Sequence, residues 1–347
     1  MERQTSYWTI RTLDQESEQA IQQAAALWKE QELIAFPTET VYGLGADATK
    51  EGAVAKIFEA KGRPADNPLI VHVADVNQIA DYVKQVPPIA QKLMDAFMPG
   101  PITLILRSND KLARNVTAGL DTIGIRVPDH PIARELLRAA NLPIAAPSAN
   151  TSGKPSPTSA IHVYHDLYGK IAGIVDGGLT GVGVESTVVD CTGNIPVILR
   201  PGGITQEEIE KITGVLTIGS TMEKQVEKPK APGMKYNHYE PDVPLWLVEG
   251  DEAFFQTEIN RLSKEGLKVG VMASEELLAK LHVANPKSCG SLEDLTTIAV
   301  HLYDTLRSFK AEEIDIILSE TFPKEGIGQA VMNRLEKAAS ATTKSSC

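Results

Sequence analysis

The sequence has very few cysteines, 3 in 347 residues. Cys191, Cys289 and Cys347 lie far apart, and none of them belongs to a CxxC pair. Closely spaced cysteines are typical of disulfide frameworks and structural zinc sites, so this spacing argues against both. A chain of this length can bury a hydrophobic core without such cross-links, and two domains are the default expectation.

Long apolar runs and an excess of basic residues are also missing. No stretch is long and apolar enough to span a bilayer, and residues 1–12 lack the charged-then-apolar layout of a secretory signal. We therefore expect a soluble, cytoplasmic protein that contacts no membrane. The net charge of -11 weighs against broad, non-specific nucleic-acid binding, which needs cationic surface. A few cations in one cleft remain compatible with that total.

Three common motifs of nucleotide and acyl chemistry do not account for this chain. The sequence has no G-x-x-x-x-G-K-[ST] phosphate loop and no G-x-S-x-G elbow around Ser148. The string GLGADA at 43–48 fits a loose G-x-G-x-x-A dinucleotide pattern. That pattern works only where the first glycine leads directly from a strand into a helix, and residues 37–42 intervene here. Any ATP site must therefore be built in another way.

What is present is an α/β pattern, because Val- and Ile-rich runs alternate with helical periodicity over the first two thirds of the chain. Several strands follow each other closely late in this region, so we expect a mixed sheet. Strands are predicted at 33–36, 69–73, 102–106, 122–127, 144–146, 171–175, 186–190 and 197–199, and helices at 16–31, 52–60, 88–97 and 131–139.

A second α/β unit is predicted beyond a linker. Apolar periodicity fails over 219–244, where Lys, Glu and Pro accumulate. Short buried strands at 245–248, 269–273 and 314–318, with helical periodicity that includes 292–309, indicate a small three-layer, Rossmann-like domain. We expect the polar residues 340–347 to be disordered.

Two cations stand in a glycine–proline loop after a predicted helix. Lys61 and Arg63 can reach one anion together, arginine through a bidentate fork and lysine as a point charge. The alternative is ordinary capping, since cations suit a helix C-terminus. Capping accounts well for Lys61 but less well for Arg63, which follows Gly62, so we favour a phosphate role.

Other polar segments follow predicted strands, and each has two interpretations. In PTETVYGL at 37–44, the threonines either face a ligand or satisfy backbone groups of a turn. PSAN at 147–150 either offers donors to a polar ligand or forms a turn before a helix N-cap at Thr158 or Ser159. The glycines of 177–183 permit close approach of a ligand or form a flexible hairpin. His162 and His165 stand three residues apart, but we interpret this segment as helix surface and packing rather than a metal site.

Taken together, these strings resemble one family, the YrdC-type domain of threonylcarbamoyl-AMP synthases. The resemblance covers about residues 12–210, the expected catalytic domain, followed by a linker or lid at 211–243 and a small domain at 244–340. APGMKYNHY at 231–239 and the second unit resemble the longer, two-domain subgroup. The matching strings, in the family's order, are PTETVYGL at 37–44, KGRP at 61–64, NPL at 67–69, PSAN at 147–150, STV at 186–188 and LRPG at 199–202.

The resemblance implies an L-threonylcarbamoyladenylate synthase, a nucleotidyltransferase with a twisted mixed sheet and a concave basic face. It would condense L-threonine, bicarbonate and ATP to threonylcarbamoyl-AMP and pyrophosphate, with magnesium on the phosphates. A separate tRNA threonylcarbamoyl transferase complex would then use the product to modify tRNA next to the anticodon, and direct contact of this chain with tRNA would be weak. Such chemistry needs positioning and charge neutralisation more than a covalent nucleophile.

The same resemblance carries roles to individual residues. No residue acts as a nucleophile, and Lys61 and Arg63 are the most important groups. We further hypothesise that 232–239 closes as a lid, with Lys235 near phosphate; docking of the two domains is the alternative. Threonine would be held by Thr38, His72, Arg126 on its carboxylate, and Ser186. ATP would be contacted by Lys61, Arg63, Ser148, Asn150 and Arg200, lined by Thr122 and Ala146, and touched by Tyr236 or Tyr239.

Two other functional classes stay open. A concave cationic face can also hold an RNA backbone, and a nucleotide-independent, strongly salt-sensitive affinity for tRNA would favour such a binding module. A carbamoyl-transfer component of hydrogenase maturation also contains a YrdC-type domain. That relative carries zinc-finger domains, and the absence of paired CxxC motifs here argues against it.

Overall fold

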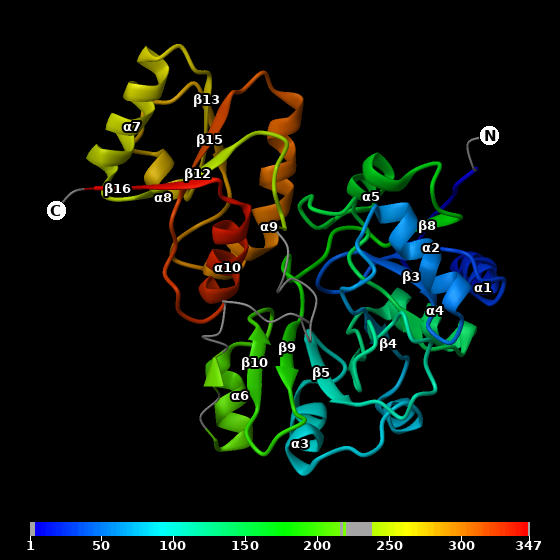
Figure 1. The fold of residues 1–347 in the computed structure, drawn as a ribbon. Helices are drawn as coiled ribbons and strands as arrows, with labels where there is room; N and C mark the ends of the chain where they lie inside the picture. Colours follow the sequence, from blue (N-terminus) through cyan, green and yellow to red (C-terminus); the bar gives the residue numbers. More distant parts are fainter. Residues whose placement is uncertain (1–3, 216–217, 220–237, 346–347) are drawn as a thin grey trace. The chain divides into compact units, whose positions relative to one another are not determined.

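The computed structural model describes residues 4–215, 218–219 and 238–345 (Figure 1). These residues divide into two compact units, the first within 1–152 and 156–236 and the second within 153–155 and 237–347. Across the described ranges, every helix is too short or too polar to cross a membrane. Residues 220–237, which make up most of the predicted linker, lie outside the described residues.

The first unit is built on a mixed sheet, as the sequence predicts. Its strand order is β1-β8-β2-β3-β7-β4-β6-β5-β9-β10-β11, and parallel and antiparallel pairs both occur. The strands among the described residues are β1 (Ser6–Thr9), β2 (Ile34–Phe36), β3 (Gly43–Asp47), β4 (Ile70–His72), β5 (Ile102–Arg107), β6 (Thr122–Arg126), β7 (Ile144–Ala145), β8 (Gly173–Asp176), β9 (Thr187–Asp190), β10 (Val197–Arg200) and β11 (Ile218–Gly219).

Helices cover both faces of this sheet, and the side chains of β2, which point alternately to the two faces, show why. Ile34 and Phe36 pack with Trp28 of α1, whereas Ala35 between them joins the core cluster that contains Ile57 of α2. Both faces of the strand are therefore buried. The helical segments of the unit are α1 (Gln15–Lys29), α2 (Glu51–Lys61), η1 (Val76–Asp81), α3 (Pro88–Phe97), α4 (Pro131–Ala140), α5 (Ala160–Leu167) and α6 (Gln206–Thr213).

The glycine-rich string at 43–48 is a strand rather than a phosphate loop. β3 pairs antiparallel with β2 and with β7. A Cβ on Gly45 would lie 2.8 Å from side-chain atoms of both Trp28 and Ile144, and the Trp28 indole donates a hydrogen bond to the Gly45 carbonyl at 3.0 Å. The glycine is therefore explained by close packing against α1, and the rejection of a dinucleotide loop is confirmed.

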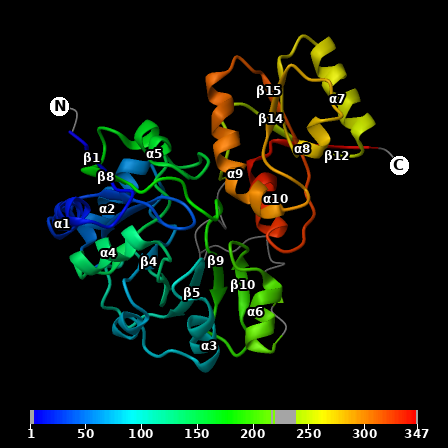
Figure 2. The ribbon, with the colours of Figure 1, turned by 180° about the vertical axis from the view of Figure 1, so that it is seen from behind.

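The second unit is a small three-layer α/β domain, as predicted. Its strands are all parallel, in the order β14-β13-β15-β12-β16, and they lie between helices on either face (Figures 1 and 2). Its elements are β12 (Leu245–Glu249), α7 (Glu252–Lys264), β13 (Val269–Ala273), α8 (Glu275–Leu278), β14 (Asn285–Ser288), α9 (Leu295–Ser308), η2 (Phe309–Ala311), β15 (Ile316–Glu320), α10 (Gly328–Ala338) and β16 (Ala341–Lys344).

The prediction that residues 340–347 are disordered is wrong over most of that range. Residues 341–344 form β16 at the edge of the second sheet, in parallel register with 246–249 of β12. Ser340 N donates to Leu245 O and Ser345 N donates to Glu249 O, both at 2.9 Å. Strand pairing uses backbone groups, so polar side chains at an edge position do not prevent it.

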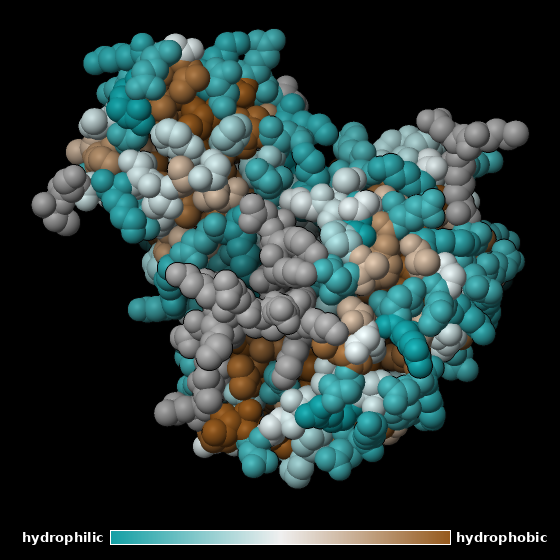
Figure 3. All heavy atoms as spheres, viewed as in Figure 1, coloured by the Kyte–Doolittle hydropathy of each residue, from teal (hydrophilic) through white to brown (hydrophobic). Residues whose placement is uncertain are grey.

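Polar and charged side chains cover most of the described surface on the face shown in Figure 3. This agrees with the net charge of -11 and with apolar residues that gather in buried clusters of both units.

Candidate active site

The predicted site residues come from strand ends and loops of the first unit. β4 pairs with β6 in a register that sets His72 opposite Arg126, and β4 pairs with β7 on its other side. The loop after β7 reaches β3 through an isolated bridge between Ser148 and Gly43. Segments that are distant in the sequence therefore deliver polar groups to neighbouring positions.

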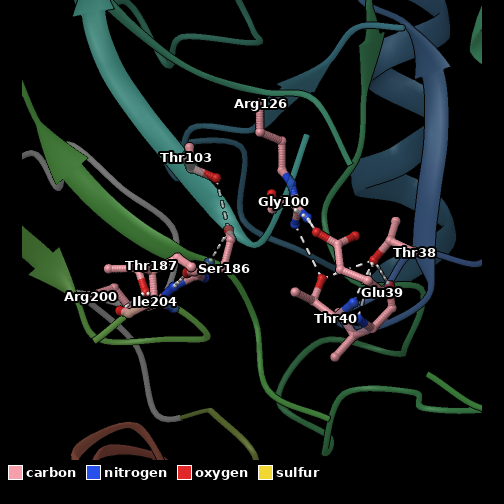
Figure 4. Close-up of polar contacts among 11 residues, drawn as sticks. Thr38, Glu39, Thr40, Gly100, Thr103, Arg126, Ser186, Thr187, Arg200 and Ile204 are labelled. Atoms are coloured by element: carbon pink, nitrogen blue, oxygen red, sulfur yellow. Dashed lines mark hydrogen bonds and ion pairs between the residues drawn. The ribbon is translucent and has the colours of Figure 1, made fainter. Parts of the chain in front are cut away.

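Arg126 lies in a buried polar cluster with the 38–40 loop (Figure 4). Its guanidinium forms an ion pair with Glu39 and donates to Thr40 Oγ1 at 3.2 Å and to Gly100 O at 3.3 Å. Thr38 Oγ1 lies 2.9 Å from Thr40 Oγ1, and it accepts from the backbone N–H groups of Thr40 and Val41. The threonines thus hold the turn, and the turn presents Glu39 to Arg126.

His72 is a neutral imidazole in this environment. Burial, reinforced by the positive charge of Arg126, lowers the pKa of His72 to about 3. The ring packs edge-on against Phe36 with centroids 5.9 Å apart, and its Nδ1 is buried without a hydrogen-bond partner among the described residues. A neutral ring can exchange a hydrogen bond with a ligand, but it contributes no charge.

Ser186 directly precedes β9, and Arg200 at the end of β10 forms hydrogen bonds with it. Ser186 Oγ lies 2.8 Å from Thr103 Oγ1 of β5, and Arg200 Nη2 donates to the Ser186 carbonyl at 2.9 Å (Figure 4). A Cβ on Gly202 would lie 2.3 Å from Glu185 O, so only glycine allows the two backbones to approach this closely. The STV string at 186–188 and the LRPG string at 199–202 therefore pack against each other.

Lys61 reaches into the loop at 147–150. The side chain is 2% exposed, and Nζ donates to the carbonyls of Ser148 and Asn150. Backbone N–H groups of Gly62 and Arg63 cap the last turn of α2, so capping does not account for the position of the ammonium. A buried ammonium beside a loop of polar groups is a suitable point charge for a phosphate.

Ser148, Asn150 and Arg63 lie around Lys61. Ser148 Oγ donates to Asn150 Oδ1 at 2.5 Å, and Asn150 Oδ1 lies 3.4 Å from Lys61 Nζ. The guanidinium of the half-buried Arg63 donates to Pro68 O at 3.5 Å. The KGRP and PSAN strings are therefore adjacent in space, as a shared phosphate site requires.

Thr122 and Ala146, the predicted nucleotide-lining residues, are both buried. Thr122 is at the start of β6, about 13 Å along an extended strand from Arg126 at its end. Ala146 follows β7, and its N–H donates to Ile70 O at 2.9 Å. Their nucleotide contacts stay predictions.

The remaining predicted residues belong to the lid segment. Residues 232–237, with Lys235 and Tyr236, lie outside the described residues. Tyr239 is described within the second unit, where its buried ring stacks on Tyr303 with centroids 5.4 Å apart and lies beneath the Arg334 guanidinium. Its contact with ATP also stays a prediction.

The second unit contains a cavity whose charged lining residues are mostly acidic. A space of about 480 Å³ lies at the carboxyl ends of β12, β13 and β15, the edge of a parallel sheet where ligands commonly bind. Its lining includes one ammonium, Lys280, and four carboxylates, Asp251, Glu252, Glu276 and Glu320. The excess of acids would repel a triphosphate, so the cations of the first unit are the better candidates for an anionic substrate.

Sequence reasoning overlooked Glu39 and Thr103 as parts of the polar cluster. Both contact predicted site residues across large sequence separations, 87 residues for Glu39 and Arg126 and 83 for Thr103 and Ser186. The available signal was a carboxylate between two threonines in a loop that already stood out. Nothing in the spacing shows which distant cation it would meet.

Comparison with known proteins identifies the family. Residues 26–202 match the Sua5/YciO/YrdC family model, described as "Telomere recombination", and residues 204–340 match "Threonylcarbamoyl-AMP synthase, C-terminal domain". Threonylcarbamoyl-AMP synthase of Bacillus subtilis (strain 168) is 54% identical over 338 residues, which cover 96% of this chain and 98% of the relative. That of Pyrococcus abyssi (strain GE5 / Orsay) is 49% identical over 321 residues, covering 91% and 92%.

The solved structures agree with this assignment. The crystal structure of P. abyssi Sua5 complexed with L-threonine matches with a TM-score of 0.93 at 45% identity, and the match covers 99% of this chain and 100% of that one. The chain therefore belongs to the Sua5/YciO/YrdC family and, within it, to the two-domain threonylcarbamoyl-AMP synthases, which are nucleotidyltransferases.

Proposed function

We propose that this chain condenses L-threonine, bicarbonate and ATP to threonylcarbamoyl-AMP and pyrophosphate. The observation that carries the proposal is the arrangement of buried cations in the first unit, where Lys61 lies with the 147–150 loop and Arg126 and Arg200 lie with buried hydroxyls. These groups suit the two anionic parts of the substrates, a carboxylate and a triphosphate.

Threonine binds at the Arg126 end of the site. Arg126 takes the carboxylate, and Thr38, Ser186 and the neutral His72 offer short-range hydrogen bonds to the rest of the molecule. Support comes from the burial of these four side chains and from the P. abyssi relative, which was crystallised with L-threonine. A neutral imidazole with a buried, unpartnered Nδ1 suits the hydroxyl of the substrate better than a charged group.

ATP binds at the Lys61 end. Lys61 and Arg63 neutralise the phosphates, and Arg200 does so from its position beside Ser186. Ser148 and Asn150 supply hydrogen bonds, and Thr122 and Ala146 line the nucleotide. Magnesium enters as the counter-ion of the triphosphate and so is part of the substrate. Charge-assisted contacts to phosphate are the stronger class of hydrogen bond, and they need no movement of the protein at the moment of reaction.

The chemistry needs no protein nucleophile. The threonine ammonium first loses a proton to solvent, and the resulting amine combines with bicarbonate to N-carboxythreonine with loss of water. A carbamate oxygen then attacks the α-phosphorus, and the bond to pyrophosphate breaks. Cations fixed around the phosphates stabilise the charge that develops on the leaving group. The adenylate then passes, in the cytoplasm, to a separate transferase complex that modifies tRNA next to the anticodon.

One reaction tests this proposal. The purified chain is incubated with ATP, bicarbonate and labelled threonine, and pyrophosphate and labelled adenylate are measured. Both products should form in equal amounts and should depend on all three substrates. Failure to form labelled adenylate in the presence of active, folded protein would refute the proposal. A strong, salt-sensitive affinity for tRNA without nucleotide would favour the RNA-binding alternative instead.

A further inference from the structure

In the ion pair between Arg126 and Glu39, each side chain has one buried polar atom without a hydrogen-bond partner among the described residues. Both side chains are almost fully buried, with 4% and 11% of their surfaces exposed. Glu39 Oε1 pairs with Arg126, while Glu39 Oε2 and Arg126 Nε are buried atoms without hydrogen-bond partners among the described residues. A carboxylate acceptor and a guanidinium donor are thus both unsatisfied within one contact pair.

An ion pair of this kind would cost folding free energy if it served only to hold the structure together. Burial of charge is compensated only when the geometry is good and the remaining donors and acceptors are also satisfied. Each buried polar atom left without a partner carries a desolvation penalty. The surrounding polar groups already engage the Arg126 terminal nitrogens, since Thr40 Oγ1 and Gly100 O accept from them. The unsatisfied atoms therefore point to a ligand that supplies one acceptor and one donor.

A zwitterionic α-amino acid has this chemistry. Its carboxylate supplies acceptors and its ammonium supplies donors, and both groups are attached to the same carbon atom. An ion pair in contact presents the opposite charges side by side in the same way. The charges of Arg126 and Glu39 are therefore complementary to an amino-acid zwitterion, whereas Arg126 alone would accept any carboxylate.

We propose that Glu39 binds the α-ammonium of the substrate while Arg126 binds its carboxylate, so that Glu39 determines specificity for an amino acid. This inference rests on the proposed function, because it assumes that threonine binds at Arg126. Glu39 gives up part of its contact with Arg126 to the incoming carboxylate and gains the ammonium through Oε2. The turn at Thr38 and Thr40 holds Glu39 in place.

The test compares L-threonine with 3-hydroxybutanoate, which keeps the carboxylate, the hydroxyl and the methyl group but has hydrogen in place of the ammonium. Binding of each ligand to the full-length chain is measured by calorimetry, for wild type, Glu39→Gln and Glu135→Gln. Glu135 is the matched control, because it forms an exposed ion pair with Arg138 on α4. ATP affinity is measured for all three proteins.

Wild type should bind threonine at least about tenfold more tightly than 3-hydroxybutanoate, as expected for a charge-assisted hydrogen bond. Glu39→Gln should weaken threonine binding by about tenfold to a hundredfold. Its affinity for 3-hydroxybutanoate should stay unchanged or increase, since the glutamine no longer competes for Arg126 with full charge. ATP affinity should change less than twofold, and Glu135→Gln should match wild type in every titration.

Three outcomes would overturn the inference. They are equal affinities of wild type for the two ligands, unchanged threonine affinity in Glu39→Gln, and parallel loss of both ligands in that variant. If Glu39→Gln does not fold, Glu39→Asp is measured in the same way, and the wild-type comparison still decides. Failure of wild type to bind threonine at all would instead count against the proposed function.

Discussion

Replacement of Lys61 by methionine separates a phosphate role from a structural one. Methionine keeps the apolar stem but removes the ammonium that donates to Ser148 O and Asn150 O. Each acceptor left without a partner costs about 1–3 kcal/mol, but the variant no longer buries a charge, which itself costs several kcal/mol. These effects oppose each other, so the net change in unfolding free energy should stay within about 2 kcal/mol.

The effect on ATP has no such compensation. A lost charge-assisted contact costs about 1.5–3 kcal/mol, which corresponds to a roughly 10- to 150-fold lower kcat/KM for ATP. Lys56→Met on the same helix is the control, because Lys56 forms a partly exposed pair with Glu32 that should be worth at most about 1 kcal/mol. Pyrophosphate release gives the kinetics, and urea unfolding gives the stability.

The result that would refute this reasoning is a folded Lys61→Met protein with the wild-type kcat/KM for ATP. In that case the ammonium would serve only to join α2 to the 147–150 loop. A stability loss much larger than about 2 kcal/mol, with unchanged kinetics at low temperature, would lead to the same conclusion.

Three further predictions concern Arg126, His72 and Gly202. Arg126→Lys should raise KM for threonine at least about tenfold and change KM for ATP much less, because an ammonium lacks the bidentate fork; equal effects in substrate titrations would indicate a general structural role. Because the pKa of His72 falls from 6.5 to about 3 on folding, the unfolded chain binds the extra proton, and stability must decrease as pH falls below about 6.5. Between pH 6.5 and 5 this group alone should cost about 2 kcal/mol, and His72→Gln should remove that part of the slope in urea melts at each pH. Gly202→Ala should lower the unfolding free energy by about 1–3 kcal/mol, because its Cβ would lie 2.3 Å from Glu185 O; Gly181→Ala, with open space at that position, should not, and equal urea midpoints would contradict this account.

The sequence alone was sufficient for the elements with strong periodicity and for the family. The run at 102–106 appears as β5, and Pro131 begins α4 at the predicted residue, since the missing N–H of proline is harmless in a first turn. The six motif strings lie in loops and strand ends, where their composition differs from that of core segments, so they identified the family without any knowledge of their arrangement.

Local patterns failed where a neighbouring segment decides the structure. GLGADA at 43–48 has few β-branched residues and resembles a loop, but Trp28 and the flanking strands β2 and β7 make it a strand in which Gly45 is required. The polar segment 341–344 becomes β16 because the edge of β12 offers backbone partners. Neither outcome can be read from the segment itself.

The same limit applies to the candidate site. Lys61 and Arg63 were identified from the sequence as anion-binding groups, because their types and their position in a glycine–proline loop suit that chemistry, whereas Arg126 was assigned through the family resemblance. The pairing of Arg126 with Glu39 was decided only by the tertiary structure, through the order of strands in the sheet and a turn that presents the carboxylate. Composition and spacing describe neighbours along the chain, whereas the charges that complete a buried site come from segments that only folding brings together.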